Sequence, residues 1–532
     1  MASLPRPLPG MFLPRSMSKR RAITAINANG QAASLARCRR YNIILIPTRE
    51  ASSTSTSPVS TSTSLSSTST RSLHSSSTHS APSSNLTLPG VSPSSLLPNH
   101  QQHHRQPQGT DMGPPKPAPL SVLPLVTVLR SWMTATISSS PFLLPPSLAI
   151  MSMLAHTNNP MLNPDSNPLL RGLLKKTFYA QFCAGEQPTE VTRTIKGLKD
   201  AGFEGVILGY AKEVVAPHGQ EGAGSVSKIH LKETKADAEE IDSWAQGTLM
   251  TVLLASRGDY VALKFTGAGV LALRCLRQGA DPSPKLKMAI ESICVLAQAR
   301  GVRLLFDAEQ AAVQGGIDKW TMEFMERYNR TQLVVYGTYQ AYLKSTPETL
   351  SRHLQEAKDK GFVLGVKLVR GAYLGSDPRQ LIHDTKEDTD RAYDGIAEAL
   401  LKRDWQVEPL EGEGEIPEVA VVVATHNRDS VVKAKRILQH EGKTSDVAFA
   451  QLQGMADEVS CELVACNKQG AAEKLEKAKA YKYLVWGSTG ECMKYLLRRA
   501  YENRDAVQRT VGSRDAMRAE ILRRLKSLFG FA

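Results

Sequence analysis

The 532-residue sequence lacks the patterns that mark zinc centres, disulfide-stabilised folds and membrane spans. Its seven cysteines are scattered and none forms a CxxC pair, so neither a zinc site nor a disulfide framework is indicated. No group of His, Cys and carboxylates has metal-ligand spacing, so no metal site is predicted. A transmembrane helix needs about 20 uninterrupted apolar residues, and the apolar stretch at residues 119–156 is interrupted by Arg130 and several prolines.

Acidic residues are nearly absent from the first 110 residues, which contain eleven Lys/Arg and a single acid, Glu50. This segment supplies +10 of the formal charge of +14, so the excess describes a basic leader and no nucleic-acid partner is expected. Residues 1–49 are rich in Arg and Ser and have no long apolar core, as is typical of a mitochondrial presequence. Residues 50–117 are rich in Ser, Thr and Pro, which predicts a disordered linker.

Residues 118–175 are apolar and are expected to form a helical N-terminal extension. Two roles remain open for it: packing onto the globular part of the chain, or docking on a membrane or a partner protein. We expect residues 176–532 to form one folded domain.

In that domain, short apolar, β-branched runs alternate with helical patterns. The interiors of these runs are almost continuously apolar, which is expected of parallel strands covered on both faces. The runs are residues 204–209, 260–265, 302–307, 333–336, 362–369, 418–425, 447–452 and 481–486. Helix starts lie between them, with Thr346 as an N-cap before Pro347, and Ser488 and Glu491 as a capping box. Eight strands alternating with eight helices predict an α/β fold, a (β/α)8 barrel of the TIM type.

Chemistry in such barrels is located at the carboxyl ends of the strands and on the loops that follow. Lys264 lies within an apolar strand and needs a partner to offset its desolvation; Asp307, at the end of the next strand, is the expected one. Strand alternation places Lys367 and Arg370 on opposite faces, so these two cations are not expected to act together. The polar candidates at strand ends are Lys264, Asp307, Gln340, Lys367, Arg370, Tyr373, Thr425, His426, Asn427, Gln451 and Tyr483.

Residues 267–272 (GAGVLA) follow a strand and fit the G-x-G-x-x-A dinucleotide fingerprint. That fingerprint requires an acid about 20 residues later in a compact βαβ unit. The next strand ends only at Asp307, so the intervening segment is too long. We therefore interpret the glycines as a tight turn between a strand and a loop.

The helix after the last predicted strand contains Arg498, Arg499 and Glu502, whose spacing lets the three side chains converge on one helix surface. Guanidinium groups bind a carboxylate through paired hydrogen bonds, and a glutamate can receive an ammonium group. The same spacing also suits an ion-paired surface. The position of the helix after the last strand of a barrel favours a site that binds a zwitterion.

Eight segments in order along the chain resemble the proline dehydrogenase family, the FAD-dependent enzymes of proline catabolism. All but the first, which precedes the first predicted strand, lie at a predicted strand end or in the helix that follows it, so the resemblance covers the barrel as a whole. The segments are residues 177–185 (TFYAQFCAG), 262–269 (ALKFTGAG), 306–309 (FDAE), 340–342 (QAY), 366–373 (VKLVRGAY), 424–427 (ATHN), 451–455 (QLQGM) and 495–503 (YLLRRAYEN).

The resemblance implies a role for each matching position. Arg498 and Arg499 are expected to bind the proline carboxylate, and Glu502 is expected to lie near the amine. The rest of the substrate pocket would comprise Lys264, Asp307, Tyr373, Leu452 and Tyr483. The FAD contacts would be Gln340, Lys367, Val369, Arg370, Gly371, Ala372, Thr425, His426, Asn427, Gln451 and Leu452.

The implied activity is oxidation of L-proline to 1-pyrroline-5-carboxylate, with electrons passed to a membrane quinone. The resemblance further implies a monofunctional enzyme on the matrix side of the mitochondrial inner membrane, in peripheral association with it. Two positions depart from the family pattern: Lys367, where bacterial bifunctional members usually have Arg, and Gly209, where many relatives have Asp.

Three alternatives remain at this stage. A hydroxyproline dehydrogenase would use the same chemistry, but in that branch the position of Tyr483 tends to hold a smaller residue. A Schiff-base barrel lyase would use Lys264 or Lys367 as its nucleophile and would need a lysine with a lowered pKa. A non-enzymatic, partner-binding barrel would need neither.

Overall fold

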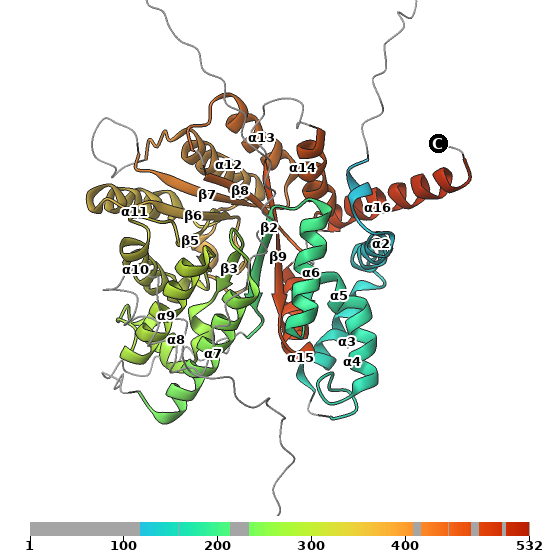
Figure 1. The fold of residues 1–532 in the computed structure, drawn as a ribbon, viewed down its shortest axis with the longest axis horizontal. Helices are drawn as coiled ribbons and strands as arrows, with labels where there is room; N and C mark the ends of the chain where they lie inside the picture. Colours follow the sequence, from blue (N-terminus) through green and yellow to red (C-terminus); the bar gives the residue numbers. More distant parts are fainter. Residues whose placement is uncertain are drawn as a thin grey trace, which may run out of the picture. The chain divides into compact units, whose positions relative to one another are not determined.

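A computed structural model of the chain describes residues 118–157, 159–212, 233–407, 416–444, 446–469, 478–502 and 507–530. The predicted presequence and linker lie outside these residues. The described part contains a closed ring of parallel strands surrounded by helices (Figure 1). The predicted (β/α)8 barrel is therefore confirmed.

The barrel closes because its last strand pairs with two others. β9 (Lys479–Trp486) is hydrogen-bonded to β8 through Lys479–Tyr483 and to β2 through Tyr481–Trp486. The short strand β1 (Cys183–Gly185) pairs with the carboxyl end of β9. The remaining strands pair in chain order: β2 (Gly205–Tyr210), β3 (Tyr260–Leu263), β4 (Arg303–Phe306), β5 (Val335–Gln340), β6 (Leu364–Val369), β7 (Val419–Ala424) and β8 (Asp446–Leu452).

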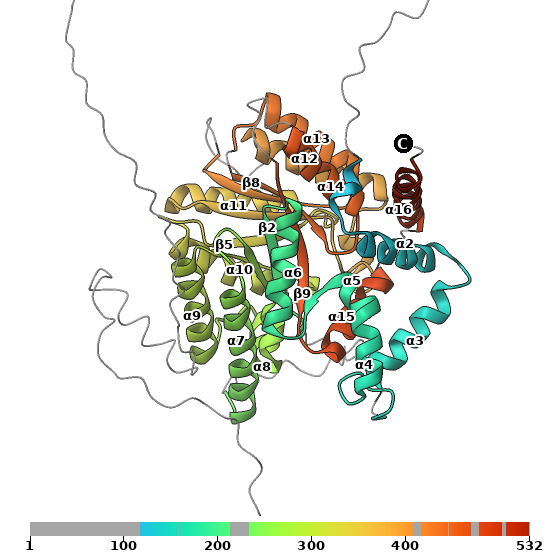
Figure 2. The same cartoon turned by 45° about the vertical axis from the view of Figure 1, so that its right-hand side comes forward.

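A helix follows each barrel strand; those after β2 to β8 pack on the outside of the ring, whereas the helix after β9 lies at the carboxyl end of the barrel and packs against α3 (Figures 1 and 2). These helices are α7 (Lys235–Leu254), α9 (Pro284–Arg300), α10 (Ala311–Tyr328), α11 (Thr346–Lys360), α12 (Lys386–Lys402), α13 (Arg428–His440), α14 (Asp457–Gln469) and α15 (Thr489–Glu502). Short α8 (Val270–Arg277) precedes α9, and α6 (Pro188–Ala201) precedes β2. Outside this ring lie α2 (Leu125–Ser139), α3 (Leu144–His156), α4 (Pro168–Leu174), α5 (Ala180–Phe182) and α16 (Val507–Leu528).

Two local predictions were wrong. The strand predicted at residues 333–336 is β5, which starts at Val335 and continues to Gln340. Gly337, Thr338 and Gln340 hid its second half, because they interrupt the apolar run. Thr346 is the first residue of α11 and not its N-cap, since its hydroxyl donates to the carbonyl of Gln340 at 2.6 Å.

Two other local predictions are confirmed. The Ser488 amide donates to Glu491 at 3.0 Å and the Glu491 amide to the Ser488 hydroxyl at 3.3 Å, which forms the capping box of α15. Gly269 has a φ of +107° and turns the chain into α8. A Cβ at this position would clash with the carboxylate of Glu240, which accepts a hydrogen bond from the Val270 amide. The glycine motif is therefore a turn.

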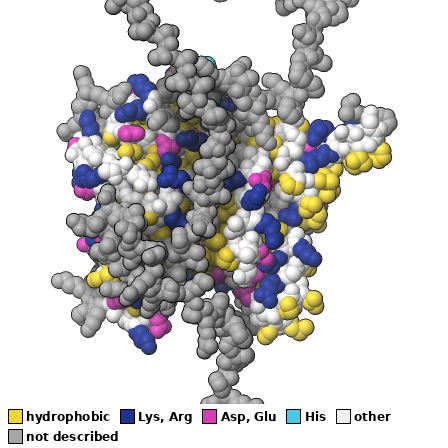
Figure 3. All heavy atoms as spheres, in the orientation of Figure 1, with side chains coloured by type: hydrophobic (Ala, Val, Ile, Leu, Met, Phe, Trp, Pro, Cys, Tyr) yellow, Lys and Arg dark blue, Asp and Glu magenta, His cyan; other side chains and the backbone are white. Residues whose placement is uncertain are grey.

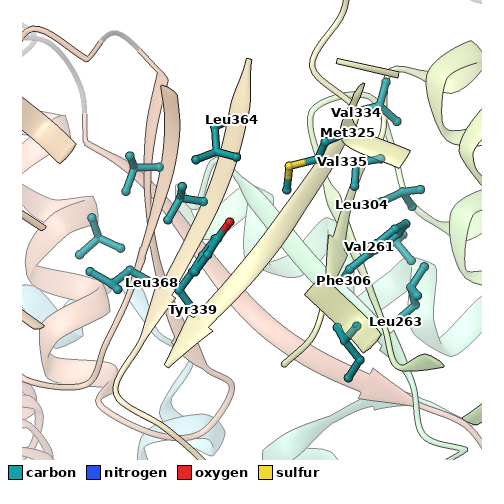
Figure 4. Close-up of a cluster of buried hydrophobic side chains, with 14 of the residues drawn as sticks. Val261, Leu263, Leu304, Phe306, Met325, Val334, Val335, Tyr339, Leu364 and Leu368 are labelled. Atoms are coloured by element: carbon teal, nitrogen blue, oxygen red, sulfur yellow. The ribbon is translucent and has the colours of Figure 1, made fainter. Parts of the chain in front are cut away.

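Both faces of the strands are buried, which explains their continuous apolar sequences. One set of side chains, including Ile207, Tyr260 and Val422, fills the interior of the barrel. The alternate set packs outward against the helices. Figure 4 shows part of this outer layer, with Val261, Leu263, Leu304, Phe306, Val335 and Leu364 on neighbouring strands.

The amino end of the barrel is closed by one arginine. Arg303 Nη1 donates to the hydroxyl groups of Tyr260 at 2.9 Å and Tyr336 at 3.2 Å, and its Nη2 lies 2.6 Å from Asp446 Oδ2. These charged and polar groups satisfy one another within the protein. This end is therefore a structural plug, and the opposite end is left for chemistry.

A buried ion pair connects the outer helices to the barrel. Lys482 on β9 and Asp457 on α14 are 2.7 Å apart, with side chains only 1% and 5% exposed. The hydroxyl of Ser131, on α2, donates to the same carboxylate at 3.1 Å and accepts from Gln181 at 2.7 Å. The pair thus joins α2 and α14 to a barrel strand.

We predict that Lys482→Met will lower the free energy of unfolding by about 3–5 kcal/mol, because Asp457 would stay buried without its counter-charge. Denaturant unfolding at neutral pH would measure the change. The matched control is Lys196→Met, which breaks an exposed i,i+4 pair with Asp200 and should cost less than about 0.5 kcal/mol. Equal effects of the two substitutions would contradict the prediction.

Candidate active site

One carboxylate at the carboxyl end of the barrel holds two lysines. Asp307, directly after β4, accepts from Lys264 Nζ at 2.8 Å through Oδ2 and from Lys367 Nζ at 2.6 Å through Oδ1. Lys264 follows β3, and Lys367 lies within β6. The predicted Lys264–Asp307 contact is present, and the structure adds Lys367 to it.

Tyr483 of β9 completes this group. Its hydroxyl donates to Asp307 Oδ2 at 3.3 Å, and Lys367 Nζ lies 5.4 Å from the centre of its ring. Gly209, at the end of β2, leaves room for this hydroxyl, since a Cβ at Gly209 would lie 3.1 Å from it. The absence of a side chain at Gly209, which departs from the family pattern, therefore has a local physical reason.

Burial and the neighbouring charges shift the pKa values of Asp307 and Lys367. Burial opposes ionisation of Asp307, but the charges and hydrogen bonds of Lys264 and Lys367 outweigh it and hold the carboxyl pKa well below its ordinary value. Burial lowers the pKa of Lys367; Asp307 opposes that shift, and the charges of Lys264 and Arg499 add to it. The site therefore gathers more positive than negative charge.

The arginine pair lies in α15, the helix after β9. The guanidinium groups of Arg498 and Arg499 lie 5.9 and 5.7 Å from the ring centre of the buried Tyr495. The effect of Arg499 on the pKa of Lys367 places it within electrostatic reach of the cluster. Glu502 ends α15, and its side chain lies outside the described part of the structure, so its predicted contact with an amine stays a prediction.

A second network lies at the ends of β6 and β7 and is centred on Arg370. Its guanidinium donates to Asp390 at 2.7 Å, to the Thr425 hydroxyl at 2.6 Å and to Ser430 at 2.9 Å. It also stacks 4.3 Å from the ring centre of Tyr393. Lys367 and Arg370 thus act in separate networks, as strand alternation predicts.

The other predicted cofactor contacts lie along the same edge and hold the loops there in place. The amide of Gln340 donates to the Glu309 carbonyl and accepts from the Ala372 amide, both at 3.2 Å. His426 Nε2 accepts from the Leu452 amide at 3.1 Å. Asn427 caps α13, and Gln451 donates to the Thr425 carbonyl at 3.2 Å. Val369 ends β6, and Gly371, Ala372 and Tyr373 begin the loop that follows.

The sequence matches the profile of a known protein family. The proline dehydrogenase family profile matches residues 191–511, which include every barrel strand from β2 to β9. The chain belongs to the proline dehydrogenase family. Membership makes it an oxidoreductase and excludes both the Schiff-base lyase and the non-enzymatic barrel.

Several curated members of the proline dehydrogenase family are similar to the chain. A probable mitochondrial proline dehydrogenase of Schizosaccharomyces pombe is 28% identical over 449 residues, covering 75% of this chain and 89% of its own. Mitochondrial proline dehydrogenase 1 of Arabidopsis thaliana is 29% identical over 67% of this chain and 76% of its own. A hydroxyproline dehydrogenase of Rattus norvegicus is 28% identical over 66% and 83%.

Among solved structures, proline utilization A from Bdellovibrio bacteriovorus, inactivated by N-propargylglycine, shares the fold with a TM-score of 0.50 and 16% identity. The match covers 72% of this chain and 38% of that longer one.

Several residues that hold the site's side chains and strand ends in place were not identified from the sequence. Asp390 and Tyr393 lie in the first turns of α12, and because Asp390 is 20 residues after Arg370, no local pattern joins them to that arginine. Glu309 accepts a hydrogen bond from the Thr266 amide at 3.1 Å and ties the ends of β3 and β4 together. In the sequence, only its position within the family-like segment 306–309 pointed to a role for Glu309.

We predict that Asp307 contributes to the pH dependence of stability. Its folded-state pKa lies below the unfolded value of about 3.9, so its contribution is complete above about pH 4 and is lost as pH falls. Unfolding free energies measured from pH 6 down to pH 3 should therefore fall less steeply in Asp307→Asn than in the wild type. The control Asp200→Asn, at an exposed pair, should follow the wild-type slope. Parallel curves for Asp307→Asn and the wild type would contradict the prediction.

Proposed function

We propose that this protein oxidises L-proline to 1-pyrroline-5-carboxylate with FAD as its cofactor and passes the electrons to a membrane quinone. The observation that carries the proposal is the cluster in which Lys264 and the buried Lys367 share the buried Asp307, within electrostatic reach of Arg499, in a chain of the proline dehydrogenase family. A small amino acid is the ligand that such a set of charges suits.

Substrate binding is assigned to the arginine pair. Guanidinium groups hold a carboxylate through paired, charge-assisted hydrogen bonds, and two adjacent arginines supply enough donors for both oxygens. The surplus of positive charge around Lys264, Lys367 and Arg499 also favours an anion at this end of the barrel. Fixing the carboxylate orients the proline ring, and such positioning supplies a large part of the rate enhancement.

Formation of the C=N bond requires a neutral amine, because the nitrogen lone pair becomes part of the new double bond. The proline ammonium must therefore lose its proton before or during oxidation. We assign control of that proton to Glu502, acting directly or through water. Tyr483 and Leu452 are assigned to the wall of the substrate site, and Tyr373 is assigned to it from the loop after β6.

The residues present suit a flavin at the ends of β5 to β8. Among the described residues, Asp307 is the only hydrogen-bond acceptor of Lys367, so two of its three N–H donors can reach a ring nitrogen or oxygen. The binding residues would be Gln340, Lys367, Val369, Arg370, Gly371, Ala372, Thr425, His426, Asn427, Gln451 and Leu452. Bound FAD would supply a two-electron acceptor, while the protein supplies orientation and electrostatics.

The proposal also assigns the protein a location in the cell. The relatives named above from Schizosaccharomyces pombe and Arabidopsis thaliana are mitochondrial by name, and residues 1–49 have the composition of a presequence. We therefore place the enzyme on the matrix side of the mitochondrial inner membrane, in peripheral contact with it. Residues 50–117 would serve as the linker, residues 118–175 as the extension and residues 176–532 as the catalytic domain.

Hydroxyproline oxidation is the second candidate, because a hydroxyproline dehydrogenase is among the relatives. The Tyr483 hydroxyl, fixed on Asp307, argues against it. A tyrosine at this position would crowd a hydroxyl group on C4 of the substrate ring.

Anaerobic titration of the purified full-length protein would test the function. We expect a yellow protein whose flavin absorbance bleaches when L-proline is added and bleaches much less with 4-hydroxyproline. A preference for 4-hydroxyproline would favour the second candidate. A colourless protein that is covalently trapped by borohydride in the presence of a keto substrate would overturn the proposal.

We predict that Arg499→Met will raise the KM for proline by about 10–100-fold, the loss expected when charge-assisted hydrogen bonds to a carboxylate are removed. Steady-state kinetics with a soluble electron acceptor would measure it, and the bound flavin content should not change. The control is Lys494→Met, at an exposed position of the same helix, which should behave as the wild type. Loss of flavin from Arg499→Met would instead show a structural role for the helix.

A further inference from the structure

Four helices outside the barrel present large apolar side chains to solvent. We call the exposed sides of α2, α3, α4 and α16 the apolar helical face. Its most exposed members are Phe142 at the turn between α2 and α3, Leu169 on α4 and Leu528 on α16, which are 87%, 85% and 81% exposed. Figure 3 shows hydrophobic side chains gathered along the edge where these helices lie (Figure 1). A surface of this kind usually marks an interaction site.

The opposite sides of the same helices are anchored in the protein. On α2, Val128 is buried and Ser131 binds Asp457. On α3, Met151 and Leu154 pack with residues of α15 in one core cluster. On α16, Met517 is buried in the main core. The exposed apolar side chains are therefore not needed for the fold, and they face outward from helices whose other sides are fixed.

Charge distinguishes this region from the rest of the folded chain. Residues 118–176 contain four Lys/Arg and one acid, and residues 507–528 contain six Lys/Arg and two acids. Residues 177–506 contain 43 Lys/Arg and 46 acids. The acids of the two helical segments are occupied: Asp165 accepts from the Gly490 amide, Asp515 pairs with Arg514, and Glu520 pairs with Arg523 and Arg524. Of the cations, Arg130 faces the protein and Lys175 pairs with Glu186 and Glu190, while Lys176, Arg518 and Lys526 are exposed. An apolar face with exposed cations on its segments is complementary to an anionic lipid surface.

The geometry of α2 and α3 favours lying on a bilayer. No helix of the described residues is long and apolar enough to cross a membrane alone. Together, α2 and α3 have the length and apolar composition of a membrane span, but the two helices are bent by 106° at their junction, where Phe142 lies. Within α2, Arg130 donates to the Ala180 carbonyl at 2.9 Å, which fixes a charge on the protein side of the helix. The turn between the two helices is thus an exposed apolar corner.

We propose that the apolar helical face docks the enzyme peripherally on an anionic phospholipid bilayer, with the Phe142 corner inserted among the lipid headgroups. A second copy of the chain is disfavoured as the occupant, because it would bring the same excess of positive charge. The face lies one helix away from the candidate site, since α3 packs against α15, the helix of Arg498 and Arg499. This inference rests on the proposed function, in which the electron acceptor is dissolved in the membrane.

Vesicle flotation of the full-length protein would test the docking. The probes are phosphatidylcholine vesicles with and without an anionic phospholipid, at moderate salt. We expect the wild type to float with the anionic vesicles, and Phe142→Glu combined with Leu169→Glu to bind them at least about tenfold more weakly. A second variant, Leu528→Glu with Phe529→Glu, should weaken binding independently through α16. The control is Met288→Glu, an exposed apolar position on α9, which should float as the wild type does.

Three results would overturn the docking surface: no flotation of the wild type, equal flotation of both double variants and the wild type, or a change of oligomeric state in the variants alone. Equal flotation would mean that other parts of the chain, such as the basic leader present in every variant, bind the lipid. Activity with a soluble acceptor should be unchanged in all variants. If the wild type failed to oxidise proline with that acceptor, the proposed function would fail, while flotation would still report on the docking.

Discussion

The candidate site depends on the pairing of the Asp307 carboxylate with two lysines. It lies inside the carboxyl end of the barrel and accepts hydrogen bonds from the half-buried Lys264 and the buried Lys367, so that two ammonium groups share one counter-charge. Without it, each lysine would lose its proton or leave the interior, because an unpaired charge is costly in a medium of low polarity. Tyr483 is fixed by the same carboxylate, so four strands contribute to a single electrostatic unit.

The charged side chains are neutralised within the protein at one end of the barrel but not completely at the other. At the amino end, Arg303 meets Asp446 and two tyrosine hydroxyls, and the group is satisfied within the protein. At the carboxyl end, Lys264 and Lys367 bind Asp307, and the charge of Arg499 acts on Lys367, which leaves a surplus of positive charge. A surplus of this kind suits an anionic ligand, which explains how one fold provides a closed structural end and an open chemical end.

The helices outside the barrel belong to the same arrangement. α2 reaches the barrel through Ser131 and the buried Asp457–Lys482 pair, and Lys482 is the neighbour of Tyr483 on β9. α3 packs against the helix of the arginine pair. The segment before the barrel thus supports the substrate side of the site, and its outward face remains available for an interaction.

The sequence by itself determined the ring of eight strands, because strands buried on both faces must be apolar almost throughout, and it indicated the Lys264–Asp307 pair through the cost of an unpaired lysine. The arginine pair was visible from helical spacing, and its ligand from resemblance to a family. Only the tertiary structure decided that Lys367 joins Asp307 from 60 residues away, that Asp390 holds Arg370, and that Gly209 makes room for Tyr483. Closure of the barrel brings these strand ends into one ring, and contacts across a ring leave no trace in local periodicity.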